Sequence, residues 1–166
     1  MSDNATLIDE AFSPSMAPTL HFAKALAPQS LDSGLARYLT DGLEVVDGRA
    51  LIAARFRLQR GDIDCAFDMT AFETLVNKIH ADDWYSEQLG SQSVEQKLAQ
   101  VRILASQVAD QAGRLGYSVT IYVTIGTRND LVFRFHTDHA GEPAWTTDPV
   151  GLLEPVLRQT WRPTLT

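Results

Sequence analysis

The sequence YSVTIYVTIGTRNDLVFRFH, residues 117–136, decides the fold, because apolar and polar side chains alternate strictly on both sides of a turn. Alternation with a period of two is typical of β-strands that bury one face and expose the other. The segment GTRND between the two runs is typical of a hairpin turn. The stretch therefore predicts an antiparallel hairpin in which Arg134 and His136 point to solvent. Its buried face would carry Tyr117, Val119, Ile121, Val123, Ile125, Leu131, Phe133 and Phe135.

Two helices are predicted upstream of this hairpin, each from a capping box, in which a hydroxyl side chain accepts a hydrogen bond from an early backbone amide. The motif TAFE, with Thr70 and Glu73, would begin a helix that runs to about His80. The motif SVEQ, residues 93–96, would begin a second helix that ends at Gly116. This second helix is amphipathic, with apolar residues every three or four positions: Val94, Leu98, Val101, Ala105, Val108, Ala112 and Leu115.

Further strands are predicted on both sides of these elements. The runs ALIAARFRLQ, residues 50–59, and DIDCAFDM, residues 62–69, alternate in the same way and predict a first hairpin. The sequence SLDSGLARYLTDG, residues 30–42, predicts a short helix before it. Near the end of the chain, Asp148 and Pro149 predict a helix start, and VLRQTW predicts a short strand.

The order hairpin, two helices, hairpin predicts an α+β fold. Because each strand alternates cleanly, we expect a two-layer sandwich: an antiparallel sheet of about four to six strands with helices on one face and solvent on the other. Pro14, Pro18 and Pro28 disfavour a long helix near the N-terminus, so residues 1–30 are expected to form a partly ordered arm. Residues 31–166 would then form a single α+β domain.

The composition narrows the classes of function. The 166 residues carry a formal net charge of −7, which disfavours nonspecific binding to nucleic acid and favours a basic protein partner. No apolar run is long enough for a membrane helix, and the start MSDNATLIDEAF is acidic where a secretory signal would be basic. We therefore expect a cytoplasmic protein. The single Cys65 is interpreted as a small core residue, and no cofactor is expected.

Acidic residues concentrate between positions 61 and 100, where aromatic residues interrupt them in the segment ADDWYSEQLGSQS. Aromatic side chains can anchor a partner in an interface, while carboxylates orient and accelerate the docking of a basic one. The alternative is a solvated acidic face, with Trp84 packed on the core. The residues predicted to bind the partner are Asp62, Asp64, Asp68, Asp82, Asp83, Trp84, Tyr85 and Glu87.

A second polar cluster lies in FRFHTDHAGEPAW, residues 133–145. His136, Asp138 and His139 are candidates for metal ligands, and Glu142 follows them. A histidine pair at a strand end lacks the helical spacing that brings the two histidines of H-E-x-x-H onto one face, so a polar strand end is the preferred interpretation. The chain also contains no G-x-S-x-G elbow and no phosphate-binding glycine loop. We do not expect an enzyme.

A pI near 4.9, the acidic segment with DDWY and the α+β layout make the chain similar to a known class of small protein. It resembles the cytosolic immunity proteins with which bacteria neutralise their own nuclease toxins. The resemblance implies a stoichiometric inhibitor of a basic toxin domain. One alternative is an acidic secretion chaperone, which would be a stable homodimer, and another is a metal-dependent enzyme that uses His136, Asp138 and His139. The sequence leaves the oligomeric state open.

Overall fold

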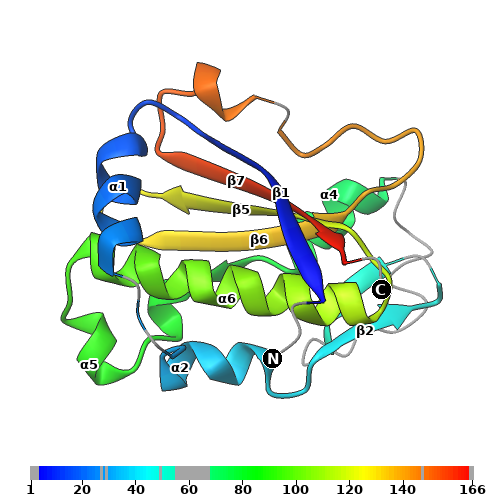
Figure 1. Ribbon diagram of the computed structural model, residues 1–166, viewed down its shortest axis with the longest axis horizontal. Coiled ribbons are helices and arrows are strands. Elements are labelled where there is room, and N and C mark those ends of the chain that lie inside the picture. The colour runs from blue at the N-terminus through cyan, green and yellow to red at the C-terminus, as the bar shows by residue number, and fades with distance from the viewer. Residues whose placement is uncertain are drawn as a thin grey trace.

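The predicted hairpin of residues 117–136 is the centre of a five-stranded antiparallel sheet (Figure 1). The computed structural model describes residues 4–26, 28, 30–48, 50–54, 68–146 and 148–164. Strand β5 (Val119–Ile125) pairs along its whole length with β6 (Leu131–Thr137), which confirms the hairpin. Strand β7 (Val156–Pro163), which includes the predicted VLRQTW strand, pairs with the other edge of β5. The short β4 (Ile79–His80) extends the sheet beyond β6.

The N-terminal residues differ from the expected loosely attached arm. Strand β1 (Ala5–Phe12) pairs with β7, so the strand order is β1-β7-β5-β6-β4. Helix α1 (Ala17–Leu26) buries Leu20 and Ala23. The prediction was wrong for these residues because Pro14 precedes α1 and Pro18 lies in its first turn, where a missing backbone N–H costs no helical hydrogen bond.

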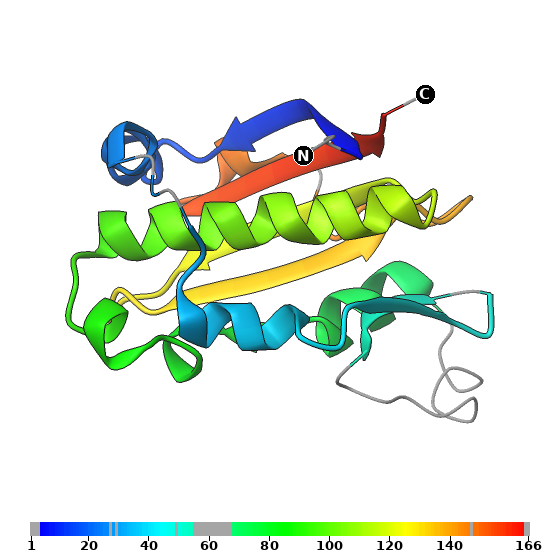
Figure 2. The same ribbon diagram turned by 60° about the horizontal axis from the view of Figure 1, so that its bottom comes forward.

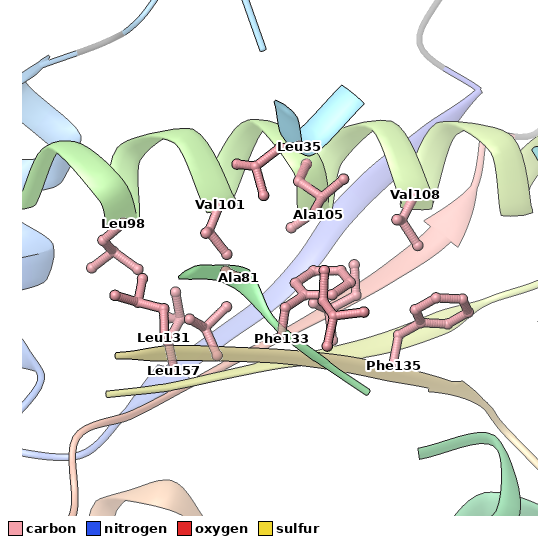
Figure 3. Close-up of a cluster of buried hydrophobic side chains, with 14 of the residues drawn as sticks. Leu35, Ala81, Leu98, Val101, Ala105, Val108, Leu131, Phe133, Phe135 and Leu157 are labelled. Atoms are coloured by element: carbon pink, nitrogen blue, oxygen red, sulfur yellow. The ribbon is translucent and has the colours of Figure 1, made fainter. Parts of the chain in front are cut away.

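The main core lies between the sheet and the long helix α6 (Val94–Arg114). The predicted capping box is confirmed, since the Ser93 side chain accepts from the Gln96 backbone N–H and the Gln96 side chain accepts from the Ser93 N–H. Gly116 follows the helix with a positive φ of 84°, as predicted for its C-terminus. Figure 3 shows the apolar side of α6 facing the sheet, with Leu98, Val101, Ala105 and Val108 above Leu131, Phe133, Phe135 and Leu157.

Short helices cover the remaining sides of this core (Figure 2). The predicted helix of residues 30–42 is a single turn, α2 (Ser33–Ala36), that continues into the 3-10 helix η1 (Arg37–Leu39). After β4 come the 3-10 helix η3 (Ala81–Asp83) and α5 (Glu87–Gly90). These segments contribute three buried side chains to the core, those of Leu35, Tyr38 and Leu89.

A separate two-stranded sheet is formed by β2 (Leu43–Val46) and β3 (Ala50–Ala53). Asp47 and Gly48 both have positive φ in the turn between these strands, as hairpins with an Asp-Gly turn require. The predicted partner of the strand beginning at Ala50 was the run 62–69. Most of that run, like the end of the run beginning at Ala50, lies outside the described residues, and Met69 begins a helix.

That helix, α4 (Met69–Val76), begins before the predicted capping box and ends before His80. Its N-cap is Asp68, whose side chain accepts a hydrogen bond from the Ala71 backbone N–H. Thr70 is therefore inside the helix, and Glu73 is buried instead of reaching back to the N-terminus. The capping box was predicted wrongly because Asp68, two residues earlier, is an equally good cap.

Glu73 of α4 and Asn77, the residue after α4, form side-chain hydrogen bonds with the backbone of both β3 and β6. Glu73 accepts hydrogen bonds from the backbone N–H groups of Leu51 on β3 (2.5 Å) and Thr137 on β6 (2.7 Å). One turn later, the Asn77 side chain accepts from Ala53 N–H and donates to the Leu51 carbonyl oxygen. These contacts satisfy edge groups of both sheets that would otherwise be buried without partners.

The outer face of the sheet is not the solvated face that strict alternation predicted. Tyr122 and His136 lie on this face and are 0% and 1% exposed. The segment that follows β6 covers them, since the Tyr122 hydroxyl bonds to the backbone of Thr146. Farther along, Asp148 caps the 3-10 helix η4 (Pro149–Gly151) as predicted. The alternating side chains of β5 therefore face two buried environments, an apolar one towards α6 and a more polar one on the outer face.

Candidate functional site

The loop from β4 to α5 carries part of the predicted acidic surface. Asp82, Asp83 and Glu87 are exposed in this loop, on η3 and the first turn of α5. The side chains of Asp83 and Glu87 have no ion pair or hydrogen bond with any residue of the described ranges. The two carboxylates are therefore available to an external cation.

Asp82 has a structural role in the same loop. One of its carboxylate oxygens accepts from the Leu131 backbone N–H at 2.9 Å, where β6 begins. The other oxygen lies 3.4 Å from Lys97 Nζ on α6. Asp82 therefore ties the loop to the sheet and to α6, and its charge is partly neutralised.

Asp32, which was not among the predicted site residues, fixes the other end of the loop. Its carboxylate caps α2 by accepting from the N–H groups of Gly34 and Leu35, and it also accepts from Ser86 N (3.1 Å) and Ser86 Oγ (2.5 Å). Burial alone would raise the pKa of Asp32, but the bonds from Ser86, Leu35 and Gly34 lower it below its ordinary value. Asp32 thus remains ionised and holds α2 against the loop.

Gly34 makes this contact possible. A Cβ atom at this position would lie 1.9 Å from the Trp84 carbonyl oxygen and 2.6 Å from the Ser86 nitrogen. Any other residue would push the loop away from α2, so Gly34 is required for the close backbone approach.

Trp84 and Tyr85 pack against the main core instead of standing free as anchors. The Trp84 ring meets Tyr38 edge to face at 6.0 Å, and Lys97 Nζ lies 5.2 Å from the centre of the Tyr85 ring. Burial, together with the charges of Asp82 and Asp32, raises the pKa of Tyr85. The aromatic pair therefore immobilises the acidic loop, and only its half-exposed edges can contact a partner.

A polar cleft of about 690 Å³ lies beside this loop, between α2 and α5. Asp32 and Glu87 provide its carboxylates, and among the described residues no Lys, Arg or His lines it. The other polar residues that line it are Ser30, Ser33, Ser86, Gln88, Gln92 and Gln100. Carboxylate and amide oxygens lining such a cleft can accept hydrogen bonds from a Lys or Arg side chain.

The remaining predicted partner-binding residues lie elsewhere or outside the described ranges. Asp68 is exposed at the N-terminus of α4, which lies far from α5 in Figure 1, and its carboxylate already caps that helix. Asp62 and Asp64 lie outside the described residues. The acidic surface is defined from here on as Asp83, Glu87 and the cleft between α2 and α5.

The histidine cluster of residues 136–142 is divided between different contacts. His136 was predicted to be exposed, but it is buried against Tyr122, with its Nδ1 2.8 Å from the Thr137 carbonyl oxygen. His139 Nε2 lies 3.0 Å from the buried Glu73 carboxylate, and Asp138 is exposed between the two histidines. Glu142 accepts from the first N–H groups of α4. Within the described ranges, no three His, Cys, Asp or Glu side chains are placed to share a metal ion.

The geometry thus defines an α+β protein with a rigid acidic surface. A family model described as the uncharacterized protein PM0498 family matches residues 12–154, and the chain belongs to this family. No curated protein and no solved structure matches the chain. Among the helices that the structure describes, none has the length and apolar character needed to cross a membrane.

Proposed function

We propose that the protein is a cytoplasmic protein-binding inhibitor of the immunity type, which neutralises a basic toxin domain through its acidic surface. The observation that carries the proposal is the rigid attachment of the loop that bears Asp83 and Glu87. Asp32, Asp82 and Gly34 fix this loop to α2, α6 and β6. A surface that is already ordered loses little conformational entropy on binding, which favours tight stoichiometric association.

Electrostatics supports the same kind of partner. The chain carries a net charge of −7, and the described residues that line the cleft beside Glu87 include no cationic side chain. Complementary charge accelerates association and disfavours partners of the wrong sign. An enzymatic role for His136, Asp138 and His139 has less support, because their side chains do not converge on a common point.

The test compares two double variants that remove the same number of charges. Asp83→Asn with Glu87→Gln removes the uncommitted carboxylates of the acidic surface. Asp41→Asn with Glu44→Gln removes two other exposed carboxylates, one from the turn after η1 and one from β2. Each tagged protein is used to capture partners from the native organism at low and then at high salt, and the affinity of the purified partner is measured by calorimetry.

We expect one basic protein that is released by salt and that binds the Asp83/Glu87 variant at least about tenfold more weakly than the wild type. The Asp41/Glu44 variant should bind it nearly as well as the wild type. An acidic partner, or equal affinity for the two double variants, would contradict the proposal. If the partner is a nuclease, loss of its activity at a one-to-one ratio would identify the chain as an inhibitor.

The secretion chaperone is a second candidate, and exposed apolar residues on α1 favour it. Phe22 and Leu26 are 61% and 47% exposed, one helical turn apart, and they border a shallow hollow of about 420 Å³. Apolar side chains grouped on a helix face can form a subunit interface. Sedimentation velocity separates the two candidates, because a stable homodimer that Phe22→Ser dissociates would favour the chaperone and a monomer would favour the inhibitor.

A further inference from the structure

The outer face of the sheet carries a row of polar side chains on three neighbouring strands. The strand register places Arg158 on β7 opposite Tyr122 on β5, and Tyr122 opposite Arg134 on β6. Arg158 forms an ion pair with Asp9 at 2.7 Å. Arg134, in contrast, has no carboxylate partner among the residues that the structure describes, and its buried Nε atom has no hydrogen-bond partner.

Trp145 covers one face of the Arg134 guanidinium, whose carbon lies 4.3 Å from the ring centre. The position of Trp145 is fixed by Tyr122. The Tyr122 ring meets Trp145 edge to face at 5.0 Å, and its hydroxyl donates to the Thr146 carbonyl oxygen at 3.1 Å. The Thr146 N–H lies 3.5 Å from the same hydroxyl. Trp145 therefore covers the Arg134 guanidinium from a position that Tyr122 sets.

Arg134 and Trp145 line a cleft of about 620 Å³ at the end of the sheet where β5 turns into β6. Its walls are mainly apolar, with Ile125, Val132 and Pro155. Thr124 and Asn129 add hydrogen-bonding groups to the lining, and the exposed Glu154 lies on the wall beside Pro155. This volume falls within the range of clefts that bind small molecules.

An arginine without a counter-ion at such a position is unfavourable unless something else compensates it. Burial lowers the pKa of Arg134 because it disfavours the charged form, although an arginine stays protonated at neutral pH. The cation–π contact with Trp145 compensates only part of the lost hydration. The chain has 21 acidic residues, yet no described carboxylate pairs with this guanidinium.

We propose that this cleft binds a small organic carboxylate with an apolar body, whose carboxylate pairs with the Arg134 guanidinium while its body lies against Ile125, Val132 and Pro155. The planar guanidinium can donate two parallel hydrogen bonds to a carboxylate. The site is separate from the acidic surface, because the two clefts share no lining residue and neither Asp83 nor Glu87 lines this one. Failure of either proposal leaves the other untouched.

The test uses benzoate as the probe and proton–nitrogen correlation NMR of the tryptophan indole groups as the readout. The Trp145 signal is assigned from Trp145→Phe. Benzoate should shift it in a saturable way, and Arg134→Gln should weaken the affinity at least about tenfold. Arg128→Gln is the matched control, because Arg128 is exposed on the same turn but does not line the cleft. Its affinity should equal that of the wild type.

Arg134→Lys keeps the positive charge and removes the planar fork, so it should bind benzoate more weakly than the wild type but more tightly than Arg134→Gln. This variant separates loss of the site from loss of the fold, because its other amide signals should match those of the wild type. The proposal is overturned if the Trp145 signal does not respond to benzoate or if Arg134→Gln binds as well as the wild type. Tighter binding of inorganic phosphate than of benzoate would also overturn it.

Discussion

Glu73 connects more of the molecule than any other single carboxylate described above. Its side chain is 0% exposed and accepts hydrogen bonds from Leu51 N–H, Thr137 N–H and Thr137 Oγ1, with His139 Nε2 3.0 Å away. These hydrogen bonds offset the cost of burying the carboxylate, but each donor would lose its acceptor if the carboxylate were removed. Its role is therefore to join α4, β3 and β6.

Substitution of Glu73 should be far more harmful than substitution of an exposed carboxylate. Glu73→Ala leaves at least two backbone N–H groups buried without an acceptor, so we expect the free energy of unfolding to fall by about 3 kcal/mol or more. Glu87→Ala, which removes an exposed carboxylate from α5, should change it by less than about 0.5 kcal/mol. Urea unfolding followed by circular dichroism measures both. A Glu73→Ala protein as stable as Glu87→Ala would show that the network contributes little.

The sequence could not predict this role, because the groups that Glu73 bonds lie 22 and 64 positions away. Locally, Glu73 has the spacing of a capping-box residue relative to Thr70, and that spacing was misleading. The burial of His136 also depends on residues distant in the sequence. Its alternation with Phe135 correctly separates the two faces of β6, but the burial of the second face depends on Tyr122 and Thr146 in other segments.

At the scale of elements, the strongly periodic segments were predictable. The β5–β6 hairpin and α6 were predicted correctly because each buries one regular face, so that the period of the sequence is the period of the structure. Strand β1 was missed because prolines after it suggested a loose arm. Strand β2 was also missed, although Asp47-Gly48 is a strong turn signal between Val45 and Leu51.

The N-terminus of α4 illustrates an element that is completed by a distant residue. Glu142 accepts hydrogen bonds from the N–H groups of Met69 (2.9 Å) and Thr70 (2.6 Å), next to the Asp68 cap. Burial opposes ionisation of Glu142, but these bonds lower its pKa from 4.5 to about 2. A carboxylate at this position satisfies free N–H groups and interacts favourably with the helix dipole.

This arrangement predicts a specific dependence of stability on pH. Because the pKa of Glu142 is lower in the folded protein, its stabilising effect is complete above pH 4.5 and is lost as the pH falls towards about 2. Glu142→Gln cannot ionise, so it should be less stable than the wild type at neutral pH and approach it in acid. Urea unfolding of both proteins across this range measures the difference. A difference that does not depend on pH would contradict the ionised cap.

At the scale of the whole molecule, the two sheets are held in different ways. The five-stranded sheet is continuous in its backbone hydrogen bonds and packs on α6. The β2–β3 sheet is attached by side chains, because Leu51 N–H donates to Glu73 of α4 and Ala53 N–H donates to Asn77, the residue after α4. The side chains of Leu51 and Ala53 also pack in the main core. The loop that carries Asp83 and Glu87 is attached to the five-stranded sheet and α6, because Asp82 in this loop bonds to β6 and to Lys97 of α6.

This difference predicts that the β2–β3 sheet opens without unfolding of the five-stranded sheet. Native-state hydrogen exchange should show the amides of Leu51 and Ala53 exchanging at least about tenfold faster than those of Ile121 and Val123. Their exchange should also depend weakly on denaturant, because opening the hairpin exposes much less surface than global unfolding. If all four amides instead share one opening free energy and one denaturant slope, Glu73 and Asn77 join the two sheets into a single cooperative unit.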